Sequence, residues 1–332
     1  MIVIAGDIGG TNSRFRLCEV NGTNIKEIFS KTYKSSESSE FINIVLQFVK
    51  EANINLKDIY SSCLAVAGPV VNNSIEVTNL PWFIRESDLQ AALENPKVKL
   101  LNDFSANAYG IETLKKEDIY TLQQGVPEPS ALKAVVGAGT GLGVAYVHRH
   151  AEETLVFPTE SGHVDYHPVG DEQAALLGYM RKKLHRVSVE RILSGPGIYN
   201  IYKYVSENAI YNQKENHKLK AKLHQGDNNQ AANIVEFALE HEDPMALRTL
   251  DIFIKTYGSV TGNVALSSIP QGGLYIVGGI APRLLKQMTD GRFMESFLDK
   301  GRMSGLLKEI PVHIVMNTNI GLQGSALYAS RL

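Results

Sequence analysis

The sequence predicts an α/β protein with two domains, and three observations support this class. Apolar runs with the length of buried strands alternate with segments whose apolar residues have helical spacing, such as 40–52 and 244–266. Three of the strand-like runs end directly in glycine-rich turns. The chain has 332 residues, of which 44% are hydrophobic, and this is enough for two sizeable cores.

The expected elements fall into two α/β sets along the chain. The first set has strands at 2–7, 13–20, 27–33, 62–68 and 98–101, and helices at 40–52 and 106–111. A polar connector with prolines, at 125–132, ends this set, and the second set begins at Ala134. It has helices at 172–184, 197–207, 231–239 and 244–266, a strand at 311–316 and helical spacing at 321–330. The polar stretch 212–229 is expected to be an exposed loop.

The three glycine-rich turns are the most informative feature of the chain. Glycines at this density let the backbone approach a ligand closely and adopt positive φ, so that successive N–H groups can point at one anion. The first two turns run into further apolar strands and form hairpins, whereas the third leads into a helix. Their residues are Gly6-Asp7-Ile8-Gly9-Gly10-Thr11, Gly137-Ala138-Gly139-Thr140-Gly141-Leu142-Gly143 and Gly278-Gly279.

These turns differ from the common phosphate-binding motifs. A hairpin is not the strand–loop–helix of a Walker A loop, and the chain has no Gly-Lys dipeptide. Leu142 stands where the last glycine of the Rossmann fingerprint would fall. A single glycine-rich hairpin is more often only a tight turn. Two such hairpins and a third turn, each after a strand, together favour a clamp that binds a nucleotide from two sides.

Polar residues within the turns point to a metal-bound nucleotide. Asp7 would repel a polyphosphate unless a divalent cation lay between them, so its presence indicates Mg²⁺ with the nucleotide, held by Asp7 through water. Thr11 and Thr140 each place a hydroxyl near the end of a turn, where it can donate to a phosphate oxygen.

Asn102 and Asp103 follow a strand-like run and open a helix. One interpretation is structural, because Asp is a favoured residue at a helix N-cap. The other is catalytic: a strand-terminal Asp between two phosphate hairpins is where a general base is expected. The helix N-terminus would favour the ionised carboxylate that a base requires.

Glu160 and His163 lie on a turn after another apolar run, and Glu190 follows later in the chain. Taken singly, an exposed Glu and a lone His are more often surface or structural residues than ligands. The residue types alone do not assign these side chains a ligand, so their role depends on the motifs in which they stand.

The composition narrows the class of protein. A formal net charge of −2, from 33 basic and 35 acidic residues, gives no sign of nucleic-acid binding. The two cysteines, Cys18 and Cys63, lie in apolar runs and the nine histidines are scattered, so neither a disulfide scaffold nor a zinc site is expected. The chain shows no signal-peptide core and no membrane-spanning run, which fits a cytoplasmic enzyme.

Six motifs, in the right order and from residue 1 to the carboxyl end, resemble those of the bacterial ATP-dependent glucokinases. The resemblance implies the two-domain actin-like ATPase fold, which is ribonuclease H-like, with a small domain of 1–110 plus 317–332 and a large domain of 111–316. The motifs are Gly6–Asn12, Leu101–Phe104, Gly137–Gly143, Glu160–Asp165, Glu190–Gly197 and Gly278–Arg283.

The resemblance also implies roles for individual residues. Asp103 accepts the proton of the 6-hydroxyl of glucose, and Asn102, Glu160, His163 and Glu190 bind the sugar. The nucleotide residues implied are Gly6, Asp7, Ile8, Gly9, Gly10, Thr11, Gly137, Gly139, Thr140, Gly141, Gly278 and Gly279. The family further implies glucose and ATP as substrates at the entry to glycolysis, and a homodimer. Asn79 is a lesser candidate for a sugar contact, and Trp82 is explained equally well as core.

Other functions remain open at this point. The repressor/ORF/kinase group carries a cysteine-rich zinc site after its E-x-G-H motif, whereas this chain has no cysteine after Cys63, which disfavours that group. A kinase for another hexose, such as mannose or an amino sugar, is compatible with the same residues. A non-kinase member of the fold that only binds ATP and changes shape is also compatible with the glycine turns, although such a protein does not need Asp103 or the sugar residues.

Overall fold

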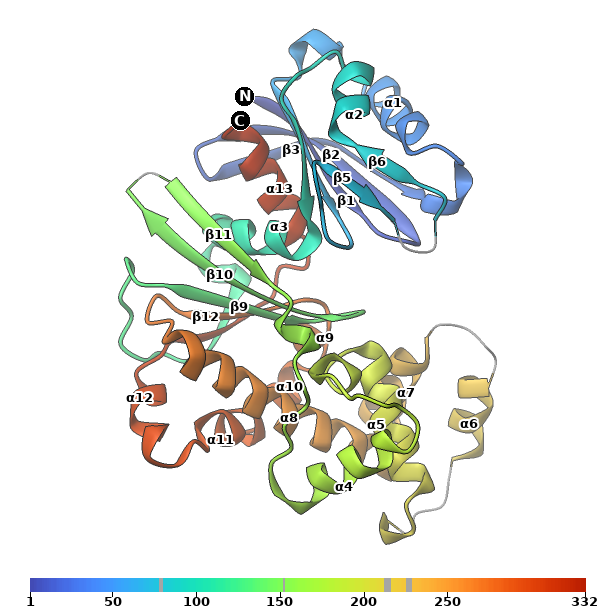
Figure 1. The fold of residues 1–332 in the computed structure, drawn as a ribbon, viewed down its shortest axis with the longest axis vertical. Coiled ribbons are helices and arrows are strands. Elements are labelled where there is room, and N and C mark those ends of the chain that lie inside the picture. Colours follow the sequence, from blue (N-terminus) through green and yellow to red (C-terminus); the bar gives the residue numbers. More distant parts are fainter. Residues whose placement is uncertain (78–79, 152, 212–215, 225–228) are drawn as a thin grey trace. The chain divides into compact units, whose positions relative to one another are not determined.

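The computed structural model describes residues 1–77, 80–151, 153–211, 216–224 and 229–332. The chain separates into two compact units, each described here by itself, whose elements are labelled in Figure 1. Unit 1 consists of Met1–Ile119, Ala145–Pro158 and Asn317–Leu332, and unit 2 consists of Tyr120–Val144 and Thr159–Met316. The domain boundaries expected from the sequence stay a prediction; residues 111–119 and 145–158, expected in the large domain, group with unit 1.

Unit 1 is built on a five-stranded sheet with helices on both faces. Its strands are β1 (Ile2–Ile8), β2 (Asn12–Asn21), β3 (Asn24–Lys34), β4 (Ser61–Val66) and β7 (Val98–Asn102), in the order β3-β2-β1-β4-β7. β1 pairs antiparallel with β2 and parallel with β4. Successive residues of β1 point to opposite faces, so Val3 packs in one core cluster and Ile4 in another. β5 (Ser74–Glu76) and β6 (Phe83–Arg85) form a separate two-stranded sheet.

The helices of unit 1 cover the two faces of the sheet. They are α1 (Phe41–Glu51), α2 (Glu86–Ala92), α3 (Asp103–Gly110) and α13 (Ile320–Ser330). Apolar residues of α1 and α2 share the core cluster of Ile4, whereas α13 contributes Leu322, Ala326 and Ala329 to that of Val3. α13 also packs closely on α3, because a side chain at Gly324 would collide with the carbonyl oxygen of Ala106. The carboxyl-terminal segment therefore belongs to the core of unit 1.

A six-stranded sheet, ordered β11-β10-β9-β12-β13-β8, forms the framework of unit 2. Its strands are β8 (Ile119–Gln123), β9 (Lys133–Ala138), β10 (Leu142–His150), β11 (Glu153–Thr159), β12 (Leu274–Val277) and β13 (Val312–Val315). The central strand β12 runs parallel to both β9 and β13. Parallel neighbours end at the same edge, so the turns after β9 and β12 lie together. Residues 145–158, which form most of β10 and β11, belong to unit 1, and the chain is part of unit 2 again from residue 159.

Helices α5, α7, α11 and α12 of unit 2 pack on the long helix α8, whereas α4 packs on α5 and α6 on α7 (Figure 1). α8 begins at Pro244, where the Asp243 side chain accepts from the N–H of Ala246 at 2.9 Å, and it is buried on most of its faces against α5, α7 and α11. The helices are α4 (Gly170–Arg181), α5 (Gly195–Glu207), α6 (His217–His224), α7 (Gln230–Glu240), α8 (Pro244–Ser268), α9 (Ile280–Arg283), α10 (Leu285–Met288), α11 (Arg292–Leu298) and α12 (Ser304–Lys308).

Most of the expected elements are present, and one expectation is wrong. The strands and helices predicted between 2 and 111 and between 172 and 330 are found with bounds shifted by a few residues. The exception is the loop expected at 212–229, which contains α6. Its sequence is polar, but Leu219 and Leu223 are spaced one helical turn apart and both are buried. The remainder of that stretch, 212–215 and 225–228, lies outside the described residues.

Candidate active site

The first glycine turn is shorter than the sequence motif suggests. Gly6, Asp7 and Ile8 are strand residues of β1, and only the segment from Gly9 to Thr11 forms the turn. Gly6 has a packing role, because an added Cβ would lie 2.6 Å from Cδ2 of Leu64. Ile8 is fully buried in the core. The turn itself is closed by the N–H of Gly9, which donates to the carbonyl oxygen of Asn12 at 2.9 Å.

Ser35 holds the first turn from the end of β3, a contact that sequence reasoning missed. Its hydroxyl donates to the carbonyl oxygen of Gly9 at 2.8 Å, and its N–H donates to that of Thr11 at 2.9 Å. Gly10 and Thr11 are both exposed. The exposed part of the turn is thus fixed from behind and open toward solvent, as a phosphate-binding turn requires.

Asp7 lies opposite Arg14 in the β1–β2 hairpin. The closest oxygen and nitrogen of the pair are 3.9 Å apart, and both side chains are partly exposed. Partial burial raises the pKa of Asp7, and the Arg14 guanidinium opposes this shift. Sequence reasoning did not single out Arg14, although the register of a tight hairpin places residues seven apart across these strands.

Asn102, rather than Asp103, caps helix α3. The Asn102 side-chain oxygen accepts from the N–H groups of Phe104 at 2.9 Å and Ser105 at 3.2 Å. Its amide nitrogen donates to the carbonyl oxygen of Gly68 at 3.0 Å. The interpretation of Asp103 as the N-cap is therefore wrong, since Asp103 is the first residue of the helix itself. The Asp103 carboxylate accepts from the N–H of Phe104, the next residue, at 2.8 Å.

The pKa of the Asp103 carboxyl is raised to about 6. Burial is the main cause, and the nearby negative charge of Asp7 adds to it. A hydrogen bond from the N–H of Phe104, at 2.8 Å, acts in the opposite direction. The helix N-terminus favours the ionised form, as expected, but burial outweighs it. A carboxyl with this pKa is half ionised at mildly acidic pH and is a stronger base than an ordinary Asp.

The second and third glycine turns lie side by side at the ends of β9 and β12. Gly137 is paired with Val277, and an added Cβ at Gly278 would lie 2.6 Å from the carbonyl oxygen of Ala138. The buried Tyr257 of α8 supports this edge, because its hydroxyl accepts from the N–H of Ala138 at 3.2 Å. Within unit 2, the structure therefore brings together two of the three turns that the sequence singled out.

Positive φ is not the reason for most of the turn glycines. Among the glycines of the three turns, all within the described residues, only Gly278 has a positive φ, at 92°. The expectation of positive φ in the first two turns is wrong. Gly139 and Gly279 instead face open space, with nothing within 4 Å of an added Cβ. Their lack of a side chain leaves the backbone free for close approach by a ligand.

Glu160 and His163 stand on a short 3-10 turn, Ser161–His163, directly after β11. Both side chains are exposed, with their nearest oxygen and nitrogen 3.7 Å apart. Thr159 fixes the entry to this turn by donating its hydroxyl to the carbonyl oxygen of Val144 at 2.8 Å. Gly162 packs directly on Leu142, because a Cβ added at Gly162 would collide with the carbonyl oxygen of Leu142. The turn that carries the sugar candidates is thus seated on the end of the second glycine turn.

Glu190 lies in a second 3-10 turn, Val189–Arg191, which is joined to the first. The N–H of Val189 donates to the carbonyl oxygen of Val164 at 2.9 Å, next to His163 in the chain. The Glu190 carboxylate accepts from the N–H of Leu142 at 3.0 Å. Ser194 caps helix α5, since its hydroxyl accepts from the N–H of Gly197 at 3.0 Å, as expected for a helix start. The structure therefore brings Glu160, His163 and Glu190 to one part of unit 2.

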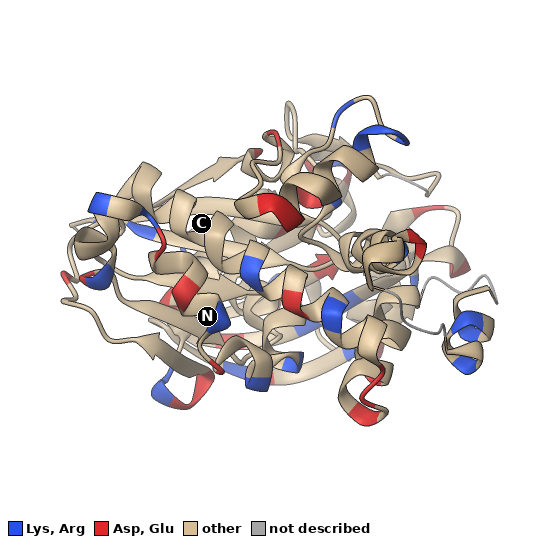
Figure 2. Ribbon diagram, turned by 90° about the horizontal axis from the view of Figure 1, so that it is seen from below, with Lys and Arg blue, Asp and Glu red and all other residues tan. Residues whose placement is uncertain are grey.

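Neither of the two lesser candidates, Asn79 and Trp82, is placed at the site by the structure. Trp82 is core, 2% exposed, with its indole N–H donating to the carbonyl oxygen of Ser38. Asn79 lies outside the described residues. Acidic and basic residues are interspersed along the ribbon in Figure 2. Within the described part of the chain, we find no helix that combines the length and the hydrophobicity needed to cross a bilayer.

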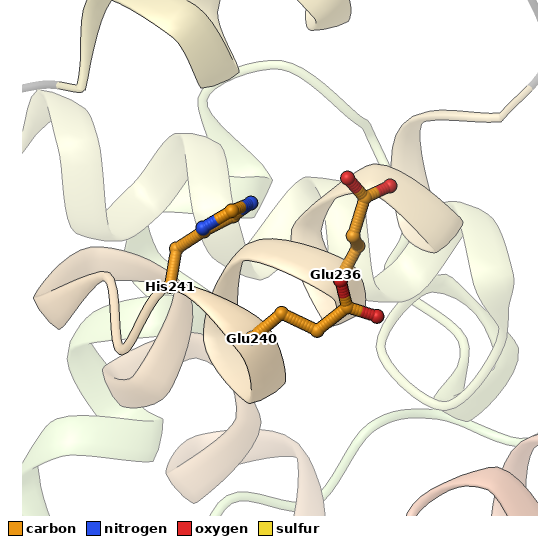
Figure 3. A group of neighbouring side chains, drawn as sticks. All are labelled: Glu236, Glu240 and His241. Carbon is orange, nitrogen blue, oxygen red and sulfur yellow. The ribbon is translucent and has the colours of Figure 1, made fainter.

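One cluster outside these motifs has the composition of a metal site. Glu236, Glu240 and His241, at the end of α7, each offer a ligand atom, and these atoms lie within 4.8 Å of one another. Figure 3 shows the three neighbouring side chains. Glu240 and His241 are exposed, however, and Glu236 already pairs with the Lys222 ammonium at 2.7 Å. The cluster is therefore explained as part of a solvated helix end.

Comparison with known proteins identifies the family. The family model described as Glucokinase matches residues 4–332. The chain belongs to the glucokinase family. The glucokinase of Trichormus variabilis is 40% identical to it, covering 100% of this chain and 99% of that protein. The glucokinase of Shigella sonnei is 34% identical, covering 98% and 96% respectively.

Solved structures agree with this assignment. A glucokinase from an Antarctic psychrotroph has a TM-score of 0.85 and 32% identity, covering 100% of this chain and 99% of its own. A glucokinase of the ROK family from Streptomyces griseus, solved with glucose and AMPPNP, has a TM-score of 0.67 and 17% identity over the full length of both chains. The second likeness shows the fold alone. These neighbours confirm the actin-like ATPase fold implied by the sequence motifs.

Proposed function

We propose that this chain transfers the γ-phosphoryl group of ATP to the 6-hydroxyl of D-glucose, with Asp103 as the general base. Membership of the glucokinase family supports glucose as the acceptor and ATP as the donor. The observation that carries the role of Asp103 is its carboxyl in the first turn of α3, where Asn102 is the N-cap, with a pKa of about 6. The products are glucose 6-phosphate and ADP.

Asp103 acts on the acceptor hydroxyl in two ways. Its carboxylate orients the 6-hydroxyl toward the γ-phosphate, and it accepts the hydroxyl proton as the new O–P bond forms. The Asn102 side chain fixes the helix start that presents this carboxylate, through hydrogen bonds of 2.9 and 3.2 Å to the backbone. Asn102 in this proposal also contacts the neighbouring sugar hydroxyls. Most of the catalytic effect is positioning, because phosphoryl transfer involves little covalent chemistry by the protein.

The sugar is held by Glu160, His163 and Glu190, and the nucleotide by the three glycine turns. Glu160 and His163 are exposed on one turn, so their polar atoms are available to hydroxyl groups. The exposed hydroxyls of Thr11 and Thr140 and the open backbone at Gly139 and Gly279 suit phosphate oxygens. The remaining nucleotide residues proposed are Gly6, Asp7, Ile8, Gly9, Gly10, Gly137, Gly141 and Gly278.

Mg²⁺ is proposed as the cofactor, held by Asp7 through water. The residue fits the ion, because a carboxylate is a hard oxygen ligand and the Asp7 side chain is 39% exposed, with the Arg14 guanidinium 3.9 Å away. When bound with ATP, the ion neutralises phosphate charge. The protein is proposed to act in the cytoplasm, without zinc, as a homodimer. Sedimentation at twice the chain mass of 36.5 kDa would support the dimer.

The decisive experiment is a hexose panel. The purified protein, with Mg²⁺–ATP, is given glucose, mannose or glucosamine, and the sugar phosphate formed is measured directly. The highest kcat/KM is expected for glucose. A preference for mannose or glucosamine would assign the chain to another hexose, and ATP hydrolysis without a sugar phosphate would assign it to the ATP-clamping proteins of this fold.

A further inference from the structure

The segment from Glu190 to Gly195 is hydrogen-bonded to both ends of the second glycine turn. At the first end, the N–H of Gly195 donates to the carbonyl oxygen of Gly139 at 2.8 Å. At the other end, the N–H of Leu142 donates to Oε2 of Glu190 at 3.0 Å. The turn from Gly139 to Leu142 is four residues long, so both of its ends are fixed by one neighbouring segment.

The same segment is internally stiff. The hydroxyl of Ser194 donates to the carbonyl oxygen of Glu190 at 2.7 Å and accepts from the N–H of Gly197 at 3.0 Å. Ser194 is 1% exposed, so these bonds are shielded from water. Glu190 is therefore attached to the capped start of α5 rather than to a free loop. Its carboxylate therefore reaches the glycine turn from an anchored backbone.

The contact of Glu190 with the turn is close and involves an ionisable group. An added Cβ at Gly141 would lie 2.6 Å from Oε2 of Glu190, so glycine is required here for the carboxylate to reach the backbone. A hydrogen bond to a carboxylate is stronger than one between neutral groups. Its other oxygen, Oε1, makes no hydrogen bond to the described residues. One oxygen of the carboxylate therefore serves the turn, and the second can accept from a ligand.

We propose that Glu190 is a positioning residue for the nucleotide as well as a ligand of the sugar. With Oε2 it holds the turn from Gly139 to Leu142 in its phosphate-binding form, and with Oε1 it accepts a hexose hydroxyl. This inference rests on the proposed function, since it takes the turn as a nucleotide site and Glu190 as a sugar residue. It adds a physical link between the two substrates that passes through one side chain.

The test separates nucleotide binding from sugar chemistry. The dissociation constant of Mg²⁺–AMPPNP is measured by calorimetry in the absence of any sugar, for the wild type and for Glu190→Ala, Glu190→Gln and Glu160→Ala. Glu190→Ala loses the acceptor of the Leu142 N–H and is expected to weaken nucleotide binding about five- to tenfold. Glu190→Gln keeps an oxygen acceptor at that position and is expected to recover most of the affinity.

Glu160→Ala is the matched control, because it removes the other sugar carboxylate without touching the turn. Its nucleotide dissociation constant is expected to stay within twofold of the wild type. Urea unfolding of each variant identifies any general loss of folding. If folded Glu190→Ala bound the nucleotide like the wild type, or if Glu160→Ala weakened it equally, the positioning role would be wrong. If the wild type bound AMPPNP but phosphorylated no hexose, the proposed function would fail while the turn contact remained testable.

Discussion

The raised pKa of Asp103 makes the pH dependence of the reaction a direct test of the proposed base. A general base must be ionised, so the activity follows the fraction of Asp103 that has lost its proton. With a pKa of about 6, against the ordinary value of 3.8, about nine in ten carboxyls are ionised at pH 7. At pH 5 the ionised fraction is about one in eleven. An ordinary Asp would still be almost fully ionised there.

We therefore expect kcat/KM for glucose, at saturating Mg²⁺–ATP, to fall about tenfold from pH 7 to pH 5. Glucose 6-phosphate should be measured directly in quenched samples, because coupling enzymes have pH profiles of their own. The magnitude rests on burial of the carboxyl and on the adjacent charge of Asp7, both of which favour the protonated form.

Asp103→Asn provides the control for this measurement. The amide has nearly the same shape but cannot accept the proton, so turnover is expected to fall about a hundredfold or more. Sugar and nucleotide binding should remain measurable. The pH profile of the residual activity should no longer have a midpoint near pH 6. A midpoint caused by titration of the nucleotide phosphates would instead appear in the profiles of both the wild type and the variant. A wild-type profile that is flat down to pH 5, or a variant within a few-fold of wild-type turnover, would refute the assignment.

Three further predictions concern the substrate sites and the fold. Glu160→Gln or His163→Ala should raise KM for glucose much more than KM for ATP in steady-state assays; equal effects would make this turn scaffold. Gly139→Val should do the reverse, because the side chain fills the open space beside the turn; an unchanged KM for ATP would contradict it. Gly324→Ala should lower the free energy of unfolding in urea by about 1–3 kcal/mol through collision with α3. The control Gly178→Ala, whose Cβ meets nothing within 4 Å, should be neutral or slightly stabilising, and similar losses in both would refute the packing argument.

The fold class and the positions of most elements could be predicted from the sequence, for physical reasons that are local. The alternation of Val3, Ile4 and Ala5 between two covered faces makes an apolar run, which is a strong strand signal. Pro244 and Asp243 mark the start of α8. The prediction of a loop at 212–229 was wrong because the short polar helix α6 has too few apolar residues to show a clear helical period in the sequence.

The site could be predicted in part, because its residues follow strands or turns that the sequence marks. What the sequence does not contain is which backbone groups those residues meet. Asn102 rather than Asp103 is the N-cap of α3, a choice between adjacent residues that composition leaves open. The glycines of the first two turns are explained by packing and open space rather than by positive φ. Such distinctions depend on neighbours that are remote in the chain.

Leu142 illustrates what long-range contacts add to a motif. In the sequence it is only the residue that breaks the Rossmann pattern. In the structure its N–H donates to the Glu190 carboxylate. Its carbonyl oxygen lies so close to Gly162 that residue 162 has no room for a side chain. The two 3-10 turns that carry the proposed sugar residues therefore meet on the backbone of one residue of the second glycine turn. Because packed backbone cannot be displaced without moving its neighbours, a change in one of the three motifs affects the other two within unit 2. Their separation in the chain, from 142 to 190, thus conceals a single structural site.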